Sequence, residues 1–219
     1  MKKFIALTPL LLAAFIARAD VTIEQKIESS IINGTSVTKI KGDMMRIESP
    51  APAGLGSMAT IVDLGKGKAT TLMAAQKMAM QMDLSAAKQA AEAAAGGQGG
   101  AKITPPKSTG QKEKVGEWMA DVYELASPAG TMKIWVARDF PNAAAIKEQM
   151  NKLSKAAVGS STDLSQFDLP GMVVKTEITS PQMKMTSTLV SVKEGPVADS
   201  EFTVPTGYNV ISAPTGAAS

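Results

Sequence analysis

Short stretches of alternating apolar and polar residues recur along most of the chain. Residues 21–32, VTIEQKIESSII, place isoleucines on one face, and the Asn33-Gly34 pair that follows is typical of a tight hairpin turn. Residues 35–48 predict the return strand, with Gly42 as a bulge. Similar patterns between turn residues predict further strands, at residues 59–64, 68–73, 78–82, 172–180 and 183–193. Residues 201–211 are expected to close the fold.

The clearest hairpin lies in residues 115–140. Ser127-Pro128-Ala129-Gly130 fits a type I turn, and the register it sets places Glu124 opposite Lys133. Strand alternation then predicts that one face carries Trp118, Ala120, Val122, Trp135 and Ala137. The other face carries Met119, Tyr123, Leu125, Met132, Ile134 and Val136. Both faces are partly apolar, so we expect both to be covered.

Two segments have helical patterns. Residues 84–95, LSAAKQAAEAAA, form an Ala-rich stretch that Asp83 or Ser85 can cap. Residues 142–158 place Ile146, Met150, Leu153 and Ala157 on one stripe. The pattern predicts an α+β fold, a curved antiparallel β-sheet (an incomplete half-barrel) of about eight to ten strands with two main helices on one side.

The first 19 residues read as a secretory signal peptide. Lys2 and Lys3 precede an apolar run that ends at Ala17-Arg18-Ala19, which predicts cleavage after Ala19. We expect the mature protein in the periplasm or secreted, with no membrane span and, lacking cysteine, no lipid anchor. Residues 20–212 are expected to form a single half-barrel domain. Its Ala/Gly-rich helix and flexible insertion occupy residues 85–111, and a disordered tail follows at 213–219.

Composition excludes several classes of function. Removal of the signal peptide lowers the 23 basic residues to 20, equal to the 20 acidic ones, so nothing electrostatic favours a nucleic-acid partner. The chain has no cysteine and no histidine, and therefore no disulfide, no thiol nucleophile and no Ser-His arrangement. We expect a protein that is not an enzyme and needs no cofactor.

Three segments resemble a family of secreted bacterial proteins, the domain of unknown function 4412. They are VGEWMADVYEL, KIWVARDF and the terminal EFTVPTGY. The layout is in turn similar to the Lol-type periplasmic lipoprotein carriers. That resemblance implies an incomplete barrel whose concave face, lidded by helices, holds acyl chains, and it implies no catalytic residues. The Ala/Gly-rich insertion departs from the carriers.

The resulting hypothesis is a non-enzymatic periplasmic protein that binds a lipid or another apolar ligand in the concave face of its sheet. The candidate ligand-lining residues are Trp118, Trp135, Met119, Tyr123, Met132, Ile134, Met78, Met80 and Met82. One alternative is a structural or interaction module without a ligand. Another is Cu(I) binding by the thioethers of Met78, Met80 and Met82, although no metal site is predicted outright. The ligand, the protein partner and the oligomeric state stay open.

Overall fold

The computed structural model describes residues 20–51, 56–89, 104–127, 130–154, 164, 167–181 and 183–212. The predicted signal peptide, most of the insertion and the predicted tail after Ser212 lie outside these residues. The described strands are β1 (Val21–Ser29), β2 (Asn33–Lys41), β3 (Met44–Ser49), β4 (Met58–Asp63), β5 (Lys68–Met73), β6 (Met78–Asp83), β7 (Lys107–Val115), β8 (Trp118–Ser127), β9 (Gly130–Ala137), β10 (Met172–Thr179), β11 (Lys184–Glu194) and β12 (Asn209–Ser212).

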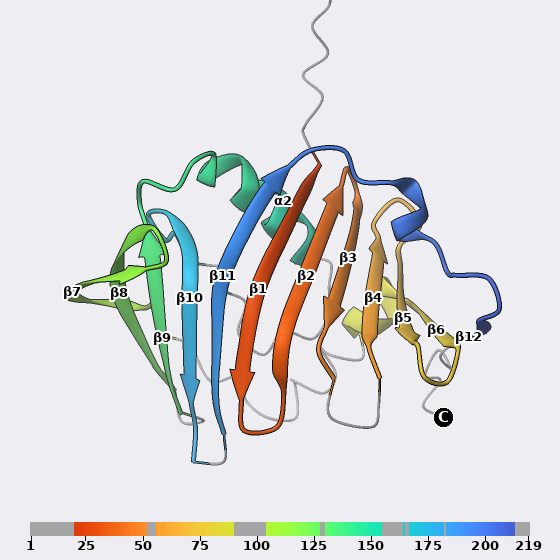
Figure 1. Ribbon diagram of the computed structural model, residues 1–219, viewed down its shortest axis with the longest axis horizontal. Coiled ribbons are helices and arrows are strands. Elements are labelled where there is room, and N and C mark those ends of the chain that lie inside the picture. Colours follow the sequence, from red (N-terminus) through yellow and green to blue (C-terminus); the bar gives the residue numbers. More distant parts are fainter. Residues whose placement is uncertain are drawn as a thin grey trace, which may run out of the picture.

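These strands form one sheet in the order β12-β6-β5-β4-β3-β2-β1-β11-β10-β9-β8-β7 (Figure 1). Neighbouring strands are antiparallel except β12, which runs parallel to β6. The first strand, β1, lies near the middle between β2 and β11. The open, antiparallel sheet agrees with the expected architecture, but it has twelve described strands rather than eight to ten.

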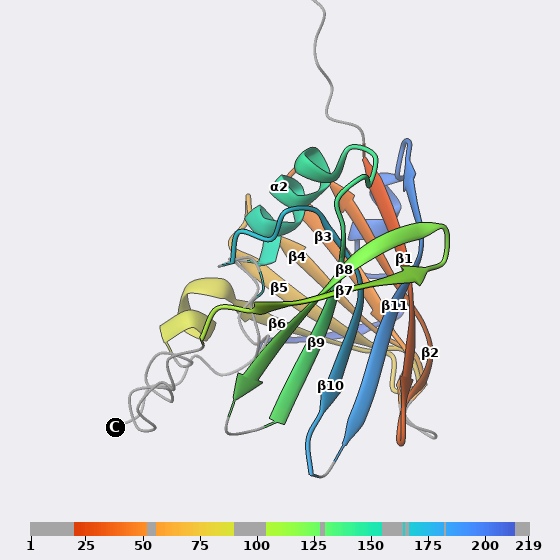
Figure 2. The ribbon, with the colours of Figure 1, turned by 90° about the vertical axis from the view of Figure 1, so that its left-hand side faces the viewer.

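The sheet curves strongly and does not close, and its two faces are covered by different segments (Figure 2). Helix α2 (Ala143–Ser154) lies on the concave side. The link from β11 to β12, which includes the 3-10 turn η2 (Asp199–Phe202), crosses the convex face. The expectation of two helices on one side holds for α2, while the described part of the other helix is a short turn at residues 84–89 beside β6.

The main hydrophobic core lies between the concave face and α2. Val21, Ile23 and Ile40 from the central strands pack there with Trp135 and with Ile146 of the helix. Ile146 is 2% exposed, which confirms that this residue turns toward the core. Met150 also packs against this cluster, whereas Ala157 lies outside the described residues. A second cluster lies on the convex face, where Phe202 and Val197 cover β4, β5 and β6.

The first hairpin differs from the sequence prediction. Asn33 and Gly34 belong to β2, opposite Glu28 and Ile27, and the turn lies before them. Ser29 builds that turn, since its hydroxyl accepts a hydrogen bond from the Ile32 amide at 2.9 Å and its own amide donates to Asn33 Oδ1. Residues 35–48, which were predicted to form one strand, belong instead to two strands, β2 and β3. Gly42, with φ +55°, occupies the turn between β2 and β3 instead of a bulge.

The register predicted for the second hairpin is confirmed. Glu124 pairs with Lys133, Val122 with Trp135, and Ser127 with Gly130 across β8 and β9. The prediction of a flexible connection up to residue 111 is wrong at its end, because residues 107–115 form β7. Asp83 does cap the helical turn 84–89, accepting hydrogen bonds from the amides of Ser85 at 2.9 Å and Ala86 at 3.3 Å. The Ser85 hydroxyl also donates a hydrogen bond to Asp83. All three hydrogen bonds lower the pKa of the Asp83 carboxyl, and the one from the Ser85 hydroxyl has the largest effect.

Candidate functional site

The two tryptophans lie on one face of the β8–β9 hairpin, as predicted. Helix α2 covers that face, but the two rings have different surroundings. Trp135 is 4% exposed and belongs to the main core. Its indole nitrogen donates to Glu113 Oε2 at 2.8 Å, and the ammonium of Lys175 lies 4.2 Å from the ring centroid. Burial, a hydrogen bond and a cation–π contact together fix this ring in place. Trp118 is only half-buried and packs at the edge of the same core.

The predicted residues on the other face of the hairpin fall into two groups. Met132 and Ile134 are buried, and Tyr123 is half-buried, in a third cluster that Leu164, Phe167 and Leu169 complete. Met119 is 61% exposed. The tryptophan face carries α2, and Leu164, Phe167 and Leu169 cover part of the other face, which leaves Met119 exposed.

Trp118 lines a cavity of about 230 Å³ at one end of the concave side. Phe140, Ile146, Val190 and Val192 supply most of the apolar wall, while Glu117 and Glu194 supply carboxylates. The Trp118 and Phe140 rings pack with their centroids 5.0 Å apart. Three distant segments thus meet here: the start of β8, the start of α2 and the end of β11.

A tight turn and a side-chain hydrogen bond hold the segments that line this cavity in position. Gly116 and Glu117 form a two-residue turn between β7 and β8, since Val115 pairs directly with Trp118. Gly116 has φ +59°, a conformation that favours glycine, and a Cβ added there would lie 3.6 Å from the Trp118 ring. On the helix side, Nδ2 of the Asn142 side chain donates to Glu194 Oε1 at 2.7 Å. This hydrogen bond ties the start of α2 to the end of β11 and keeps the wall together.

The predicted methionines lie on β6, next to the edge strand β12. Met80 and Met82 on β6 are 37% and 39% exposed, and Met78 is half-buried. Met82 pairs with Ala69 on the neighbouring strand β5, and Ala69 packs against the main core. These methionines therefore share the face of the sheet that α2 partly covers. Ile211 of β12, opposite Met80, is also exposed.

Two further methionines join this row, and the sequence did not single them out. Met58 on β4 pairs with Met73 on β5, and Met73 pairs with Met78 on β6. All three are half-buried. We call Met58, Met73 and Met78 the methionine ladder. Its members come from three strands whose mutual register a single sequence does not reveal.

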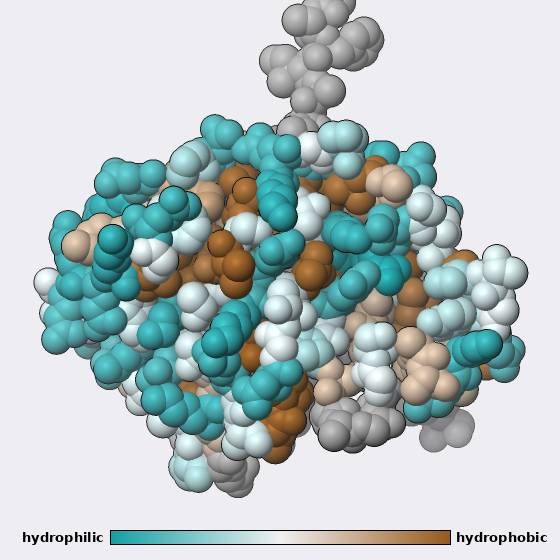
Figure 3. Space-filling view, viewed as in Figure 1, coloured by the Kyte–Doolittle hydropathy of each residue, from teal (hydrophilic) through white to brown (hydrophobic). Residues whose placement is uncertain are grey.

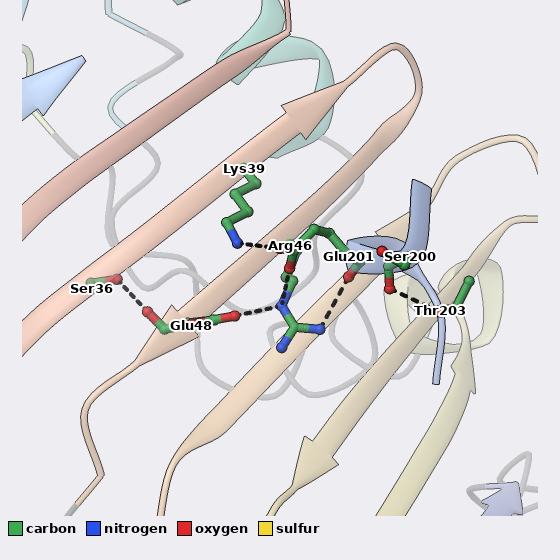
Figure 4. A network of polar contacts seen from close by, with 7 residues as sticks. All are labelled: Ser36, Lys39, Arg46, Glu48, Ser200, Glu201 and Thr203. Atoms are coloured by element: carbon green, nitrogen blue, oxygen red, sulfur yellow. Dashed lines mark hydrogen bonds and ion pairs between the residues drawn. The ribbon is translucent and has the colours of Figure 1, made fainter. Parts of the chain in front are cut away.

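The convex face is organised by ion pairs rather than by a large cavity. Arg46 on β3 contacts Glu48 Oε1 at 2.7 Å and donates to the backbone oxygen of Glu201 at 3.1 Å (Figure 4). Lys39 on β2 approaches Glu201 Oε1 at 2.8 Å. These contacts hold the link that contains η2 against β2 and β3. A smaller cavity of about 110 Å³, bordered by Arg46, Leu72 and Tyr208, lies beneath this link.

The resolved shifts in pKa belong to surface contacts, away from the cavity at Trp118. The Arg138 guanidinium lowers the pKa of the Asp121 carboxyl, and Asp121 in turn raises the pKa of Arg138. A hydrogen bond to Asp199 raises the pKa of Lys41. Within the described part of the chain, no group of three Asp, Glu, His or Cys side chains could hold a metal ion. These pKa shifts arise from hydrogen bonds and ion pairs at the protein surface.

The surface and the helices give two further facts. The convex face is mostly hydrophilic, with hydrophobic residues in small patches (Figure 3). None of the described helices has the length and apolarity needed to cross a membrane.

Comparison with solved structures finds structural similarity at low sequence identity. An uncharacterised conserved protein from Thermus thermophilus superposes with a TM-score of 0.54 at 8% identity, over 90% of this chain and 91% of that chain. The Mycobacterium tuberculosis lipoprotein LppX gives 0.46 at 8% identity, over 81% and 88%. PNGF-II gives 0.45 at 14% identity over 89% of this chain, which spans only 31% of PNGF-II.

Sequence comparison shows the family. A search of curated proteins finds no match. The family model for DUF4412, a domain of unknown function, matches residues 22–208, which include every described strand except β12. The match covers most of the chain and agrees with the resemblance noted in the three sequence segments. The chain therefore belongs to the DUF4412 family.

Proposed function

We propose that this protein is a non-enzymatic periplasmic or secreted protein that binds one apolar chain, such as an acyl group, in the cavity at Trp118. The observation that carries the proposal is the cavity itself, with an aromatic and aliphatic wall from Trp118, Phe140 and Ile146. Its volume of about 230 Å³ is below the roughly 300–1,000 Å³ of sites for drug-sized ligands. The cavity suits the end of one chain rather than a whole lipid.

The energy of binding would come from burial of methylene groups. Each CH₂ removed from water contributes about 0.8 kcal/mol, which corresponds to roughly fourfold in affinity. The carboxylates of Glu117 and Glu194 lie at the same cavity, so an uncharged or cationic head group is favoured over an anionic one.

Export of the chain is supported at the predicted cleavage point. Asp20, the first residue after that point, accepts a hydrogen bond from the Val197 amide at 2.9 Å. Its backbone oxygen accepts another from the Gly195 amide at 3.0 Å. A mature chain that begins at Asp20 would therefore begin inside the fold. N-terminal sequencing of protein purified from the periplasmic fraction should give Asp20-Val21-Thr22, and an intact N-terminus would contradict export by this route.

The test of ligand binding is a chain-length series. We expect isothermal titration with n-alkyl alcohols to show affinity rising by about fourfold per CH₂ until the cavity is full, and then to level off. Val190→Trp should fill the cavity, because Val190 lines it yet is 54% exposed, and should abolish this rise. Met119→Trp, at an exposed position on the opposite face of the hairpin, is the matched control.

An affinity that does not depend on chain length, or that survives Val190→Trp, would contradict the proposal. That result would favour the second candidate, a structural or interaction module without a ligand. The burial of residues 134–137 on both faces of β9 is the observation that favours this alternative. Mass spectrometry of an organic extract of the purified protein would separate the two, since only the first predicts a co-purifying lipid.

A further inference from the structure

The methionine ladder places three thioethers side by side on one face of three neighbouring strands. Met58 pairs with Met73, and Met73 with Met78, without an irregularity in either register. Directly opposed residues in antiparallel strands have Cβ atoms about 4.5–5.5 Å apart. Methionine has three rotatable side-chain bonds, so the outer two side chains can lean toward Met73 and bring three sulfur atoms to one point.

The ladder is more exposed than methionines that serve only as core. Met45 is 5% exposed and Met132 is 9% exposed, each within a hydrophobic cluster. The ladder residues are half-buried, and Met80 and Met82 beside them on the same face are exposed. The ladder side chains are therefore partly accessible to solvent, whereas the core methionines are buried.

Thioether sulfur is a soft, uncharged donor that selects Cu(I) over harder ions. The whole chain has no cysteine and no histidine, so methionine provides its only soft side-chain donors. A carboxylate would favour a harder divalent ion, and the register partner of Met58 on the other side is Ser49, not an acid. The donor set is thus suited to one monovalent soft cation.

We propose that Met58, Met73 and Met78 form a binding site for Cu(I), with Met80 in the adjacent register row as the nearest further thioether. This set differs from Met78, Met80 and Met82, which share a single strand and place sulfur atoms along β6 rather than around one point. It is independent of apolar-chain binding at Trp118, because the two sites share no residue.

The test uses Cu(I) itself in competition with a chromogenic chelator, and Ag(I) as a redox-stable probe. We expect one ion per chain. In protein labelled with ¹³C at the methionine methyl groups, Ag(I) should shift three resonances, assigned to the ladder by single Met→Leu variants. Each single Met→Leu replacement should weaken Cu(I) binding by at least about tenfold. Loss of a residue that merely supports a metal ligand already lowers metal affinity by about that factor. Met119→Leu is the control.

Leucine keeps the ladder apolar and removes only the sulfur. The Met58→Leu/Met73→Leu/Met78→Leu variant should therefore fold normally, retain the chain-length series at Trp118 and lose Cu(I) binding. Wild-type affinity no greater than that of this triple variant would overturn the proposal. So would a site that survives in the triple variant and disappears in Met80→Leu/Met82→Leu.

Discussion

Strands β9 and β6 belong to one sheet, yet their faces are covered very differently. In β9, Ile134 and Val136 on one face and Trp135 and Ala137 on the other are all at most 4% exposed. In β6, Ala79 on the convex face is fully buried, while Met80 on the opposite face is 37% exposed. The difference comes from the second layer: β9 lies between two covering segments, and β6 has its described cover, Phe202 and Val197, on one side.

This contrast separates two uses of apolar residues in a sheet. Side chains packed on both faces stabilise the fold and leave little room for a ligand. Exposed apolar side chains on an otherwise ordered strand contribute little to stability and are available for binding. Ile134, Trp135, Val136 and Ala137 of β9 therefore belong to the stabilising core, whereas Met80 and Met82 of β6 are accessible to a binding partner.

The strongest test of this difference between β9 and β6 is a matched pair of side-chain truncations to alanine. Ile134→Ala should lower the free energy of unfolding by about 4 kcal/mol, because it empties a fully buried position. Met80→Ala should lower it by less than about 1 kcal/mol, because the side chain is already exposed. Urea denaturation followed by circular dichroism measures both. Equal effects would show that the two strands are packed alike.

Removal of the convex cover should weaken the β4–β6 part alone. Phe202→Ala removes the largest buried side chain of the link between β11 and β12 and should cost about 3 kcal/mol. Amide hydrogen exchange should then accelerate in β4, β5 and β6 and stay slow in β8 and β9. Uniform loss of protection would mean that the sheet opens as one unit, contrary to the comparison.

The ion pairs that hold the same link should have a smaller effect. Arg46→Gln removes the contacts with Glu48 and with the Glu201 backbone, and the Arg46 side chain is 16% exposed, so the pair is partly screened by solvent. We expect a loss of about 1 kcal/mol. Lys26→Gln, which removes an exposed pair with Glu28 on β1, is the matched control and should change stability far less.

The smallest expected effect is on the pH dependence of stability, through Asp121 in the β8–β9 hairpin. Arg138 lowers the pKa of Asp121 below its ordinary value of 3.8, so the folded state favours the ionised carboxylate. This contribution to stability is fully present above that value and is lost as the pH falls through the lower pKa of the folded protein. The urea midpoint of Asp121→Asn should therefore change less between pH 5 and pH 3 than that of the unmodified protein. An identical pH profile would assign the acid sensitivity to other carboxylates, such as Asp63, whose pKa Lys66 lowers.

Local chemistry explains which parts of the fold the sequence could predict. The register of β8 and β9 was predicted correctly because the turn signal in the sequence and the opposite charges of Glu124 and Lys133 both favour the pairing that the structure shows. The Asn33-Gly34 signal failed because Ser29 and Asn33 side chains form a competing turn two residues earlier. Residues 107–115 were not predicted as a strand because, apart from Val115, their side chains are exposed and carry no apolar alternation.

The candidate sites were less predictable because each joins segments that are distant along the chain. Trp118 was recognised as a candidate, but Phe140, Val190 and Val192 were not, since only the curvature of the sheet brings β8 and β11 to one cavity. Met78 was recognised through its spacing from Met80. Its partners Met58 and Met73 depend on the register of three strands, which no residue pattern within one strand can fix.

The pairing of β1 with β11 sets an order of assembly. Val21, near the start of the folded chain, pairs with Glu194, near its end, so one edge of β1 has no native partner until almost the whole chain is available. Contacts this distant in sequence close late and slow folding. A ribosome or a translocation pore that releases this chain from its N-terminus would hold an incomplete sheet until β11 emerges.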